Sequence, residues 1–346
     1  MVRVMVLYLV GLGLGSLDYM SLKAAEEIKN CYTVYLDTYT GFISKDLMNW
    51  LTKEFYGRLR LATRRDLEDN LGRILEEARE TGIAILVPGD PLIATTHISL
   101  LVEAAKRKIP YKIIHGISIY SAAVSITGLQ AYKFGRATTL ARLGDPRETY
   151  RIIKENLERG LHTLVLLDTA DGGLTIPEAL RRLLEAEDSL RQGIVREDTL
   201  AIGLARIGLQ EELVRVAIVR ELIIESYPPP PHALIFPGEL HFMEVEALTR
   251  LYNIDEEIVK RHKPLGYGKE RVWRYIMKTR GVANSLKVRE PSREIQKILE
   301  IASSYIEDAE RFWSSGELFN ALASIAYAEG LLDSLRMIGK VDFQWL

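Results

Sequence analysis

The stretch that decides the fold is Val87-Pro88-Gly89-Asp90-Pro91-Leu92-Ile93-Ala94-Thr95-Thr96-His97. Residues 83–87 are apolar and rich in β-branched side chains, which predicts a buried parallel strand. Pro88 cannot donate to a sheet ladder, so it ends the strand. Gly89 has no Cβ and lets a ligand approach the backbone, and Asp90 places a carboxylate at the strand end. Because ligands of open α/β sheets bind at the carboxyl ends of strands, this loop predicts a binding site. An ordinary strand–turn–helix connection with an Asx turn is the alternative.

The order of strand, polar or glycine-rich loop and helix repeats through the first half of the chain. This repeat predicts a parallel sheet with helices on its faces. The expected strands are residues 4–10, 32–36, 83–87 and 111–115. The expected helices are residues 21–29, 46–55, 66–80, 95–107 and 120–127.

Residues 132–136 interrupt this order, and a second α/β half follows. Its expected strands are residues 137–142, 162–168, 199–206, 213–218 and 232–236, and its expected helices are residues 146–157, 176–187 and 241–251. The predicted fold class is therefore α/β, with two α/β lobes and a cleft between them. The predicted domains are residues 1–117 and 118–262 for the two lobes and 269–346 for a helical bundle.

After the first expected strand comes the glycine-rich turn Gly11-Leu12-Gly13-Leu14-Gly15. A dinucleotide-binding unit also opens with a strand, a glycine turn and a helix, but its pattern needs a glycine at position 16. Ser16 stands there instead, and the acid near the end of the next strand is Asp37. NAD binding is therefore weakly supported.

The composition is that of an ordinary globular protein and excludes several classes. Hydrophobic residues make up 47% of the chain and charged residues 27%, and the formal net charge is −2, which argues against a polyanion binder acting with its whole surface. The single cysteine, Cys31, excludes an intrachain disulfide and a cysteine metal cluster, and we expect it to be a small buried residue. No run is long and uncharged enough to span a bilayer, so we expect a cytoplasmic protein without a membrane partner.

Common catalytic motifs are missing from the sequence. It contains no phosphate-loop pattern and no His-Glu-x-x-His pattern, and its six histidines are scattered, so we expect no metal. We expect His97 and His115 to be hydrogen-bonded structural residues, whereas ligand contact and a structural role are equally open for His232. What remains is a set of glycine-bearing strand ends without a nucleophile or an acid–base pair. That profile fits a site that holds a preactivated cofactor and lets it react.

The character of the chain changes near residue 255. Three stripes of apolar residues at helical spacing predict three short amphipathic helices that pack as a small antiparallel bundle. Residues 260–289 contain ten Lys and Arg residues with Glu270 as their one acid. We interpret this basic stretch as a solvated face. RNA or ribosome contact is the alternative, and it is not favoured because the stretch has no interleaved base-stacking motif.

Residues 4–260 resemble the tetrapyrrole-methylase superfamily of S-adenosylmethionine methyltransferases, and within it the diphthine synthase family. Each motif is weak alone, but six in the right order are specific. They are residues 89–97, 118–122, 126–130, 132–136, 161–164 and 230–238. Asp37 departs from the family, in which glutamate would be expected before the Tyr-Thr pair. Residues 269–346 resemble a small archaeal helical domain of uncharacterised function.

The resemblance implies two α/β lobes with S-adenosyl-L-methionine bound between them. It further implies methyl transfer to the amino group of a modified histidine of translation elongation factor 2, in diphthamide biosynthesis. Members of the family are expected to be homodimers, and archaeal members to methylate the nitrogen three times. Carried over position by position, the implied cofactor contacts are Leu14, Asp90, Ile93, Ser118, Ile119, Leu167, Ile207 and His232.

The implied chemistry agrees with the sparse site. An α-amine has an ordinary pKa of about 7.7–8.0, so a useful fraction is neutral near neutral pH. We hypothesise that no single side chain is an essential general base, and we assign no catalytic residue. Asp37 and Tyr39 are the best candidates for orienting the amine. Two alternatives stay open, namely a related methyltransferase that acts on a tetrapyrrole or on ribosomal RNA, and a cofactor-binding regulatory module.

Overall fold

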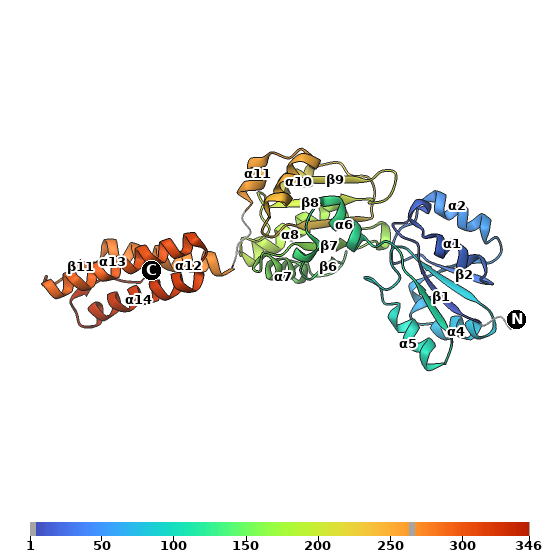
Figure 1. Ribbon diagram of the computed structural model, residues 1–346, viewed down its shortest axis with the longest axis horizontal. Helices are drawn as coiled ribbons and strands as arrows, with labels where there is room; N and C mark the ends of the chain where they lie inside the picture. The colour runs from blue at the N-terminus through green and yellow to red at the C-terminus, as the bar shows by residue number, and fades with distance from the viewer. Residues whose placement is uncertain (1–4, 263–266, 346) are drawn as a thin grey trace. The chain divides into compact units, whose positions relative to one another are not determined.

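The computed structural model describes residues 5–262 and 267–345. These residues form two compact units (Figure 1). One is an α/β unit of residues 5–156 and 161–262, and the other is a helical unit of residues 267–345 with the short segment 157–160. The α/β unit contains two five-stranded sheets, which define the first and the second lobe.

The sheet of the first lobe is entirely parallel, with the strand order β3-β2-β4-β1-β5. Its strands are β1 (Leu7–Gly11), β2 (Thr33–Asp37), β3 (Leu59–Ala62), β4 (Ile83–Val87) and β5 (Tyr111–Ile114). Its helices are η1 (Leu17–Tyr19), α1 (Leu22–Lys29), α2 (Lys45–Glu54), α3 (Arg64–Leu67), α4 (Leu71–Glu80) and α5 (Ile98–Lys106). The central strand β4 is buried along its whole length, as its apolar sequence predicts.

The alternating side chains of β4 serve two separate cores. Ile83, Ile85 and Val87 pack on the face covered by α4 and α5, and Ala84 and Leu86 pack on the face covered by α1 and α2. This division follows from the two-residue period of a strand. Both faces of the central strand are therefore apolar, and its polar neighbours begin at its carboxyl end.

The sheet of the second lobe is mixed, with the strand order β6-β7-β10-β8-β9. Only β6 and β7 run parallel, and the other neighbours are antiparallel. Its strands are β6 (Thr138–Leu140), β7 (Thr163–Leu167), β8 (Leu200–Ala205), β9 (Leu213–Ile218) and β10 (His232–Phe236). Its helices are α6 (Ile119–Thr127), η2 (Ala131–Lys133), α7 (Pro146–Leu157), η3 (Ala170–Gly172), α8 (Ile176–Leu190), α9 (Val219–Ile224), α10 (Phe242–Tyr252) and α11 (Glu256–Arg261).

The helical unit consists of α12 (Tyr267–Ser285), α13 (Arg293–Ser315) and α14 (Leu318–Met337), with a two-stranded ribbon of β11 (Lys287–Val288) and β12 (Val341–Asp342). The prediction of short helices is wrong, since these have 19, 23 and 20 residues. The long α13–α14 pair turns at Gly316, which has the left-handed φ of 85° that favours glycine. The ribbon of β11 and β12 was not predicted.

The first lobe departs from its predicted elements at three places. Strand β3 was not predicted. The expected helix 66–80 is divided at Asn70 into α3 and α4, and the helix after the central loop begins at Ile98 rather than at residue 95. The first strand is described from Leu7, and the predicted start at Val4 lies outside the described residues.

Candidate functional site

A cavity of about 680 Å³ lies within the α/β unit, and both lobes contribute to its lining. It is placed at the carboxyl ends of β1, β2 and β4 of the first lobe, as the topology of an open parallel sheet predicts. The second lobe contributes the start of α6 and the ends of several strands. The lining segments are residues 13–14, 39–42, 64, 88–90, 93–96, 118–119, 139, 166–170, 204, 206–207 and 231–233.

Glycines join the ends of β1, β4 and β5 beside this cavity. The N–H of Gly13 donates to the carbonyl of Gly89 at 3.2 Å, and the N–H of Gly89 donates to the carbonyl of Gly13 at 2.6 Å. A Cβ built on Gly11 would lie 2.6 Å from the backbone nitrogen of Gly116. Any side chain there would push the strand ends apart, so the glycine-rich turn serves close backbone packing.

Two contacts join the lobes next to the cavity. A Cβ on Gly208 would lie 2.5 Å from the Cβ of Leu14, so the Leu14 side chain rests directly on the Gly208 backbone. The guanidinium carbon of Arg206 lies 4.5 Å from the centroid of the Phe42 ring. An apolar contact and a cation–π contact thus join the two lobes beside the cavity.

All eight residues predicted to contact the cofactor line this one cavity, although they come from segments more than two hundred residues apart. Most of them are buried. Ile93 is the exception, since 41% of its surface is exposed. The structure therefore brings the predicted set together, and whether it binds a cofactor stays a prediction. The buried members are Asp90, Ser118, Leu167, Ile207 and His232, and the partly buried ones are Leu14 and Ile119.

The two carboxylates of the lining are both occupied by neighbouring groups. Asp90 accepts the N–H of Leu92 at 3.0 Å and that of Gly116 at 3.4 Å, and it pairs with Nδ1 of His115 at 2.8 Å. Asp168 accepts the backbone N–H of Ala170 in its own loop and that of Arg142, which follows β6. Burial tends to raise the pKa of Asp168, but these donors outweigh it and hold the pKa below its usual value.

His232 is fixed by hydrogen bonds at both ring nitrogens. Nδ1 accepts the N–H of Ile176 at 3.2 Å, and the Nε2–H donates to the carbonyl of Pro228 at 2.7 Å. Burial lowers the pKa of this ring, so the neutral form persists. A ligand would therefore contact the ring face or the backbone of His232 rather than a ring nitrogen.

Two residues of the lining hold a left-handed backbone without being glycine. Ala94 has a φ of 57° and Arg206 has a φ of 53°. Such conformations cost about 1–3 kcal/mol each and concentrate at ligand sites. Both lie in turns that present backbone groups to the cavity.

The prediction that Asp37 orients a substrate amine is wrong. Its side chain is fully buried and does not line the cavity. It accepts the N–H of Tyr39 at 2.8 Å and that of Thr40 at 3.1 Å, and it lies 3.2 Å from Nε2 of the buried His97. Asp37 therefore shapes the loop that carries Tyr39. Tyr39 itself lines the cavity, and burial raises the pKa of its hydroxyl.

The cavity also contains residues that the sequence did not single out. Arg64, Arg206 and Asp168 all line it. Arg64 follows β3, a four-residue edge strand whose sequence Leu-Arg-Leu-Ala has no clear alternation and gives only a weak signal. Arg206 and Asp168 stand at the ends of strands that were predicted, so their position alone was a usable signal.

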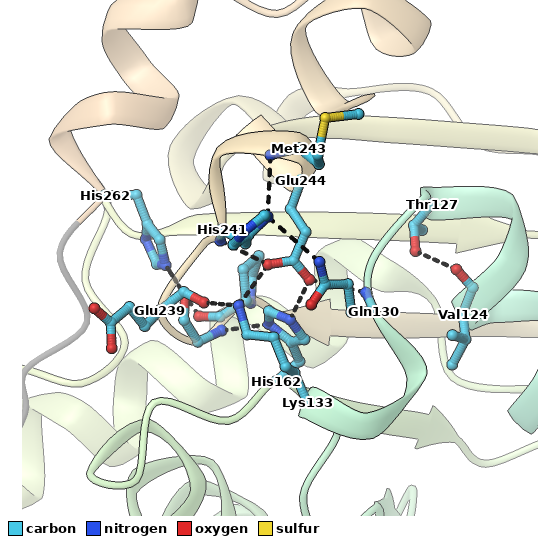
Figure 2. Close-up of polar contacts among 12 residues, drawn as sticks. Val124, Thr127, Gln130, Lys133, His162, Glu239, His241, Met243, Glu244 and His262 are labelled. Atoms are coloured by element: carbon cyan, nitrogen blue, oxygen red, sulfur yellow. Dashed lines mark hydrogen bonds and ion pairs between the residues drawn. The ribbon is translucent and has the colours of Figure 1, made fainter. Parts of the chain in front are cut away.

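A second polar cluster, around Glu244, lies at the other end of the second sheet (Figure 2). Its fully buried carboxylate accepts the backbone N–H groups of Gln130 and His241, both at 2.8 Å, and it pairs with Nε2 of His162 at 2.9 Å and Nζ of Lys133 at 2.5 Å. Every oxygen has its donors, so the cluster joins α6, β7 and α10 and leaves no group for a ligand.

The remaining predictions concern single residues and surfaces. Cys31 is buried, and burial raises the pKa of its thiol to about 12, so the structural interpretation is confirmed. Within residues 5–262 and 267–345, no group of three His, Cys, Asp or Glu side chains is arranged to hold a metal ion. No helix formed by the described residues is long and apolar enough to cross a membrane.

Several cations of the basic stretch are engaged within the helical unit. Arg280 pairs with Glu310 at 2.5 Å and Arg289 with Asp342 at 2.9 Å. The ammonium of Lys278 lies 4.9 Å from the Trp345 ring. These contacts support the interpretation of a solvated face. Lys263 of this stretch lies outside the described residues.

Comparisons with known proteins follow the division into two units. A family model described as tetrapyrrole (corrin/porphyrin) methylases matches residues 6–223, and a model described as a protein of unknown function (DUF357) matches residues 274–341. The diphthine synthase of Methanocaldococcus jannaschii is 40% identical over 253 residues, which cover 71% of this chain and 98% of the relative. That of Staphylothermus marinus is 40% identical over 268 residues, which cover 74% and 97%.

A solved structure gives the same result for the fold. A crystal structure of diphthine synthase matches with a TM-score of 0.68 and 32% identity, and the match covers 74% of this chain and 99% of that chain.

Proposed function

The chain belongs to the tetrapyrrole methylase family, and from that premise we propose that it is an S-adenosylmethionine-dependent methyltransferase of diphthamide biosynthesis. Its substrate is the amino group of the modified histidine of translation elongation factor 2. The observation that carries the proposal is the nearly complete coverage of diphthine synthases at 40% identity, together with the single cavity that collects the eight expected contacts.

The residues around the cavity suit S-adenosylmethionine. Gly89 lines the cavity with a φ of 82°, and a Cβ built on it meets no atom within 4 Å, so the glycine keeps that space open for a ligand. The cavity volume of 680 Å³ lies within the range of about 300–1,000 Å³ that is typical of small-molecule sites. The residues that would hold the cofactor are Leu14, Asp90, Ile93, Ser118, Ile119, Leu167, Ile207 and His232.

The residues of this chain act by position rather than by proton transfer. The bound cofactor supplies a methyl group on a positively charged sulfur, which leaves as a neutral thioether. Asp90 and Asp168 are occupied by backbone donors, and the raised pKa of Tyr39 keeps its hydroxyl protonated at neutral pH. The neutral fraction of an α-amine needs no base to attack, and its proton can pass to solvent afterwards. Holding the reacting groups in line is then the main contribution of the protein.

Mass spectrometry tests the proposed function directly. The purified chain is incubated with S-adenosylmethionine and elongation factor 2 that carries the unmethylated histidine adduct. The mass of the factor is expected to rise in methyl steps, whereas a factor with the unmodified histidine should not change. Cofactor binding without any mass increase would contradict the proposal and favour a regulatory module.

The proposal includes a homodimer in the cytoplasm. The exposed face of α5 supports it, because Ile98 and Val102 lie one turn apart there and are 57% and 49% exposed. Light scattering of the full chain at several concentrations measures the oligomeric state. A monomer at micromolar concentration would remove this part of the proposal and leave the activity untouched.

A further inference from the structure

Arg64 lies on the rim of the cavity, on the side of the first lobe. It opens the short helix α3 directly after the edge strand β3. Thr38, which follows β2, donates its N–H and its hydroxyl to the carbonyl of Ala62 at 3.1 and 3.0 Å, and so ties the ends of β2 and β3 together. As a result, the guanidinium carbon of Arg64 lies 5.8 Å from the centroid of the Tyr39 ring.

The side chain of Arg64 is held from one edge. Its Nε donates to Glu68 at 3.1 Å, and the other oxygen of Glu68 accepts the hydroxyl of Thr96 at 2.7 Å. Among the described residues, the hydrogen bonds of this guanidinium involve Nε alone, and 69% of the side chain is exposed. The two terminal Nη groups therefore form an open fork at the mouth of the cavity.

Arg206, the other arginine of the lining, is differently placed. Its Nε donates to Glu211 at 3.1 Å, its Nη1 donates to the carbonyl of Pro230 at 3.2 Å, and its plane covers the Phe42 ring. Only 10% of its side chain is exposed. Arg206 thus stabilises the contact between the lobes, and Arg64 is the arginine with donors to spare.

The platform beneath Arg64 is rigid. The ring of Tyr39 packs on the core of the first lobe, and its backbone N–H is bonded to the buried Asp37. The ring of His97 lies 6.1 Å from that of Tyr39 and closes the layer below. A fork that rests on a fixed ring and is braced by Glu68 loses little freedom when it binds a ligand.

We propose that the open edge of Arg64 binds the carboxylate of the amino-acid group whose α-amine receives the methyl group. This inference rests on the proposed function. A guanidinium fork matches a carboxylate through two parallel N–H···O bonds. Because an α-amine and its carboxylate share one carbon, fixing the carboxylate also fixes the nucleophile. Arg64 is therefore assigned as a substrate-binding residue.

The position of Arg64 favours the protein substrate over the cofactor as the source of this carboxylate. Most of the expected cofactor contacts are buried, and Ser118, Leu167 and His232 are each at most 6% exposed, with Ile93 as the exception. The side chain of Arg64 is 69% exposed, so a large protein can reach it from solvent.

The test uses the full chain and three variants. Arg64→Met removes the fork, Arg64→Lys keeps the charge alone, and Arg65→Met is the matched control, because Arg65 is exposed on the same helix and does not line the cavity. Arg64→Met is expected to raise KM for adduct-bearing elongation factor 2 on the order of ten- to a hundred-fold. Arg64→Lys should lie between it and the wild type, and Arg65→Met should equal the wild type.

Calorimetry with S-adenosylhomocysteine and with 5′-methylthioadenosine, which lacks the carboxylate, separates the two sources. The Kd of both is expected to stay unchanged in Arg64→Met. A loss of affinity for S-adenosylhomocysteine alone would overturn the inference and assign Arg64 to the cofactor. An unchanged KM in Arg64→Met would overturn it as well, with the proposed function intact. If the wild type transfers no methyl group, the proposed function itself has failed.

Discussion

A polar residue flanks strand β7 at each end, and the two ends differ in whether the surrounding polar groups are all hydrogen-bonded within the protein. His162, before its first residue, belongs to the cluster of Glu244, in which backbone and side-chain donors occupy both carboxylate oxygens. Asp168, after its last residue, faces the cavity. The strand between them has five residues, or roughly 17 Å at about 3.3 Å per residue.

The two ends show that hydrogen-bond saturation distinguishes a structural cluster from a binding site better than the residue types do. The Glu244 cluster has three histidines around it, a lysine and a carboxylate, yet its polar groups are satisfied within the protein (Figure 2). The cavity end also has charged side chains, but it retains open volume, a left-handed backbone at Ala94 and an arginine with free donors. Open volume and hydrogen-bond donors that lack a partner within the protein, rather than polarity alone, indicate a binding site.

The largest effect is expected from Glu244→Ala. This change leaves the Nε2–H of His162 and two backbone N–H groups without their acceptor in a buried place and removes the carboxylate that pairs with Lys133, which typically costs about 3–5 kcal/mol. Urea denaturation measures the free energy of unfolding. Glu246→Ala, an exposed acid on the same helix, is the control and should stay within about 0.5 kcal/mol of the wild type.

The same variant also tests the separation of the two ends. Cofactor affinity of the folded Glu244→Ala protein, measured by calorimetry at low temperature, should match the wild type. A loss of affinity larger than the loss of folded protein would show that the two ends are coupled, and the comparison would break.

A smaller effect is expected from Asp90→Ala. The carboxylate positions the central loop through Leu92 and joins it to the end of β5 through Gly116 and His115. Removing these hydrogen bonds should weaken S-adenosylhomocysteine binding on the order of ten- to a hundred-fold, because each charged hydrogen bond contributes about 1.5–3 kcal/mol. Asp90→Asn, which keeps one acceptor, should lie between. Unchanged affinity by calorimetry would exclude the loop from the site.

Acid should destabilise the fold before the carboxylates titrate. Burial lowers the pKa of His162, His232 and His262, and for His162 it outweighs the raising effect of Glu244. These rings are neutral when folded but take up protons in the unfolded chain below about pH 6.5, so the unfolded state binds more protons and stability falls as pH decreases. The slope is at most about 1.4 kcal/mol per pH unit for each histidine.

Urea denaturation between about pH 7.5 and 5 measures this slope, because the lowered pKa of Glu244 confines its own contribution to more acidic solution. His262→Gln, which keeps a donor toward Pro237, should reduce the slope. A slope of zero in the wild type would mean that these histidines titrate alike in both states.

Most of the fold could be predicted because most strands have a simple pattern of apolar residues. Residues 83–87 are apolar on both faces and end at a proline, and such a segment is typical of a buried parallel strand. Strand β3 was missed because it is four residues long, lies at the sheet edge and exposes two consecutive residues, Arg60 and Leu61. Edge strands carry the weakest burial signal, and β3 is the element that places Arg64.

The site was predicted to the level of segments but not of side-chain direction. The sequence predicts that Asp37 stands at a strand end, where a side chain can face either the ligand or the protein interior. In the folded chain its carboxylate lies beside the buried ring of His97, which comes from a loop sixty residues later. Such a contact arises only in the folded chain. The cavity residues carried over from the family lie together because they stand at or near the ends of strands that the topology brings to one place.

The smallest effect is expected from deletion of residues 264–346. The part that remains corresponds to relatives that are covered over 97–98% of their own length, so it should fold without the helical unit. Its Kd for S-adenosylhomocysteine should stay within about two-fold of the full chain, since the residues that line the cavity belong to the α/β unit. KM for elongation factor 2 is the informative readout. If it rises while the cofactor Kd holds, the helical unit takes part in capturing the substrate; if both hold, its role lies outside this reaction. A loss of cofactor affinity in a well-folded truncated chain would contradict the separation of the two units.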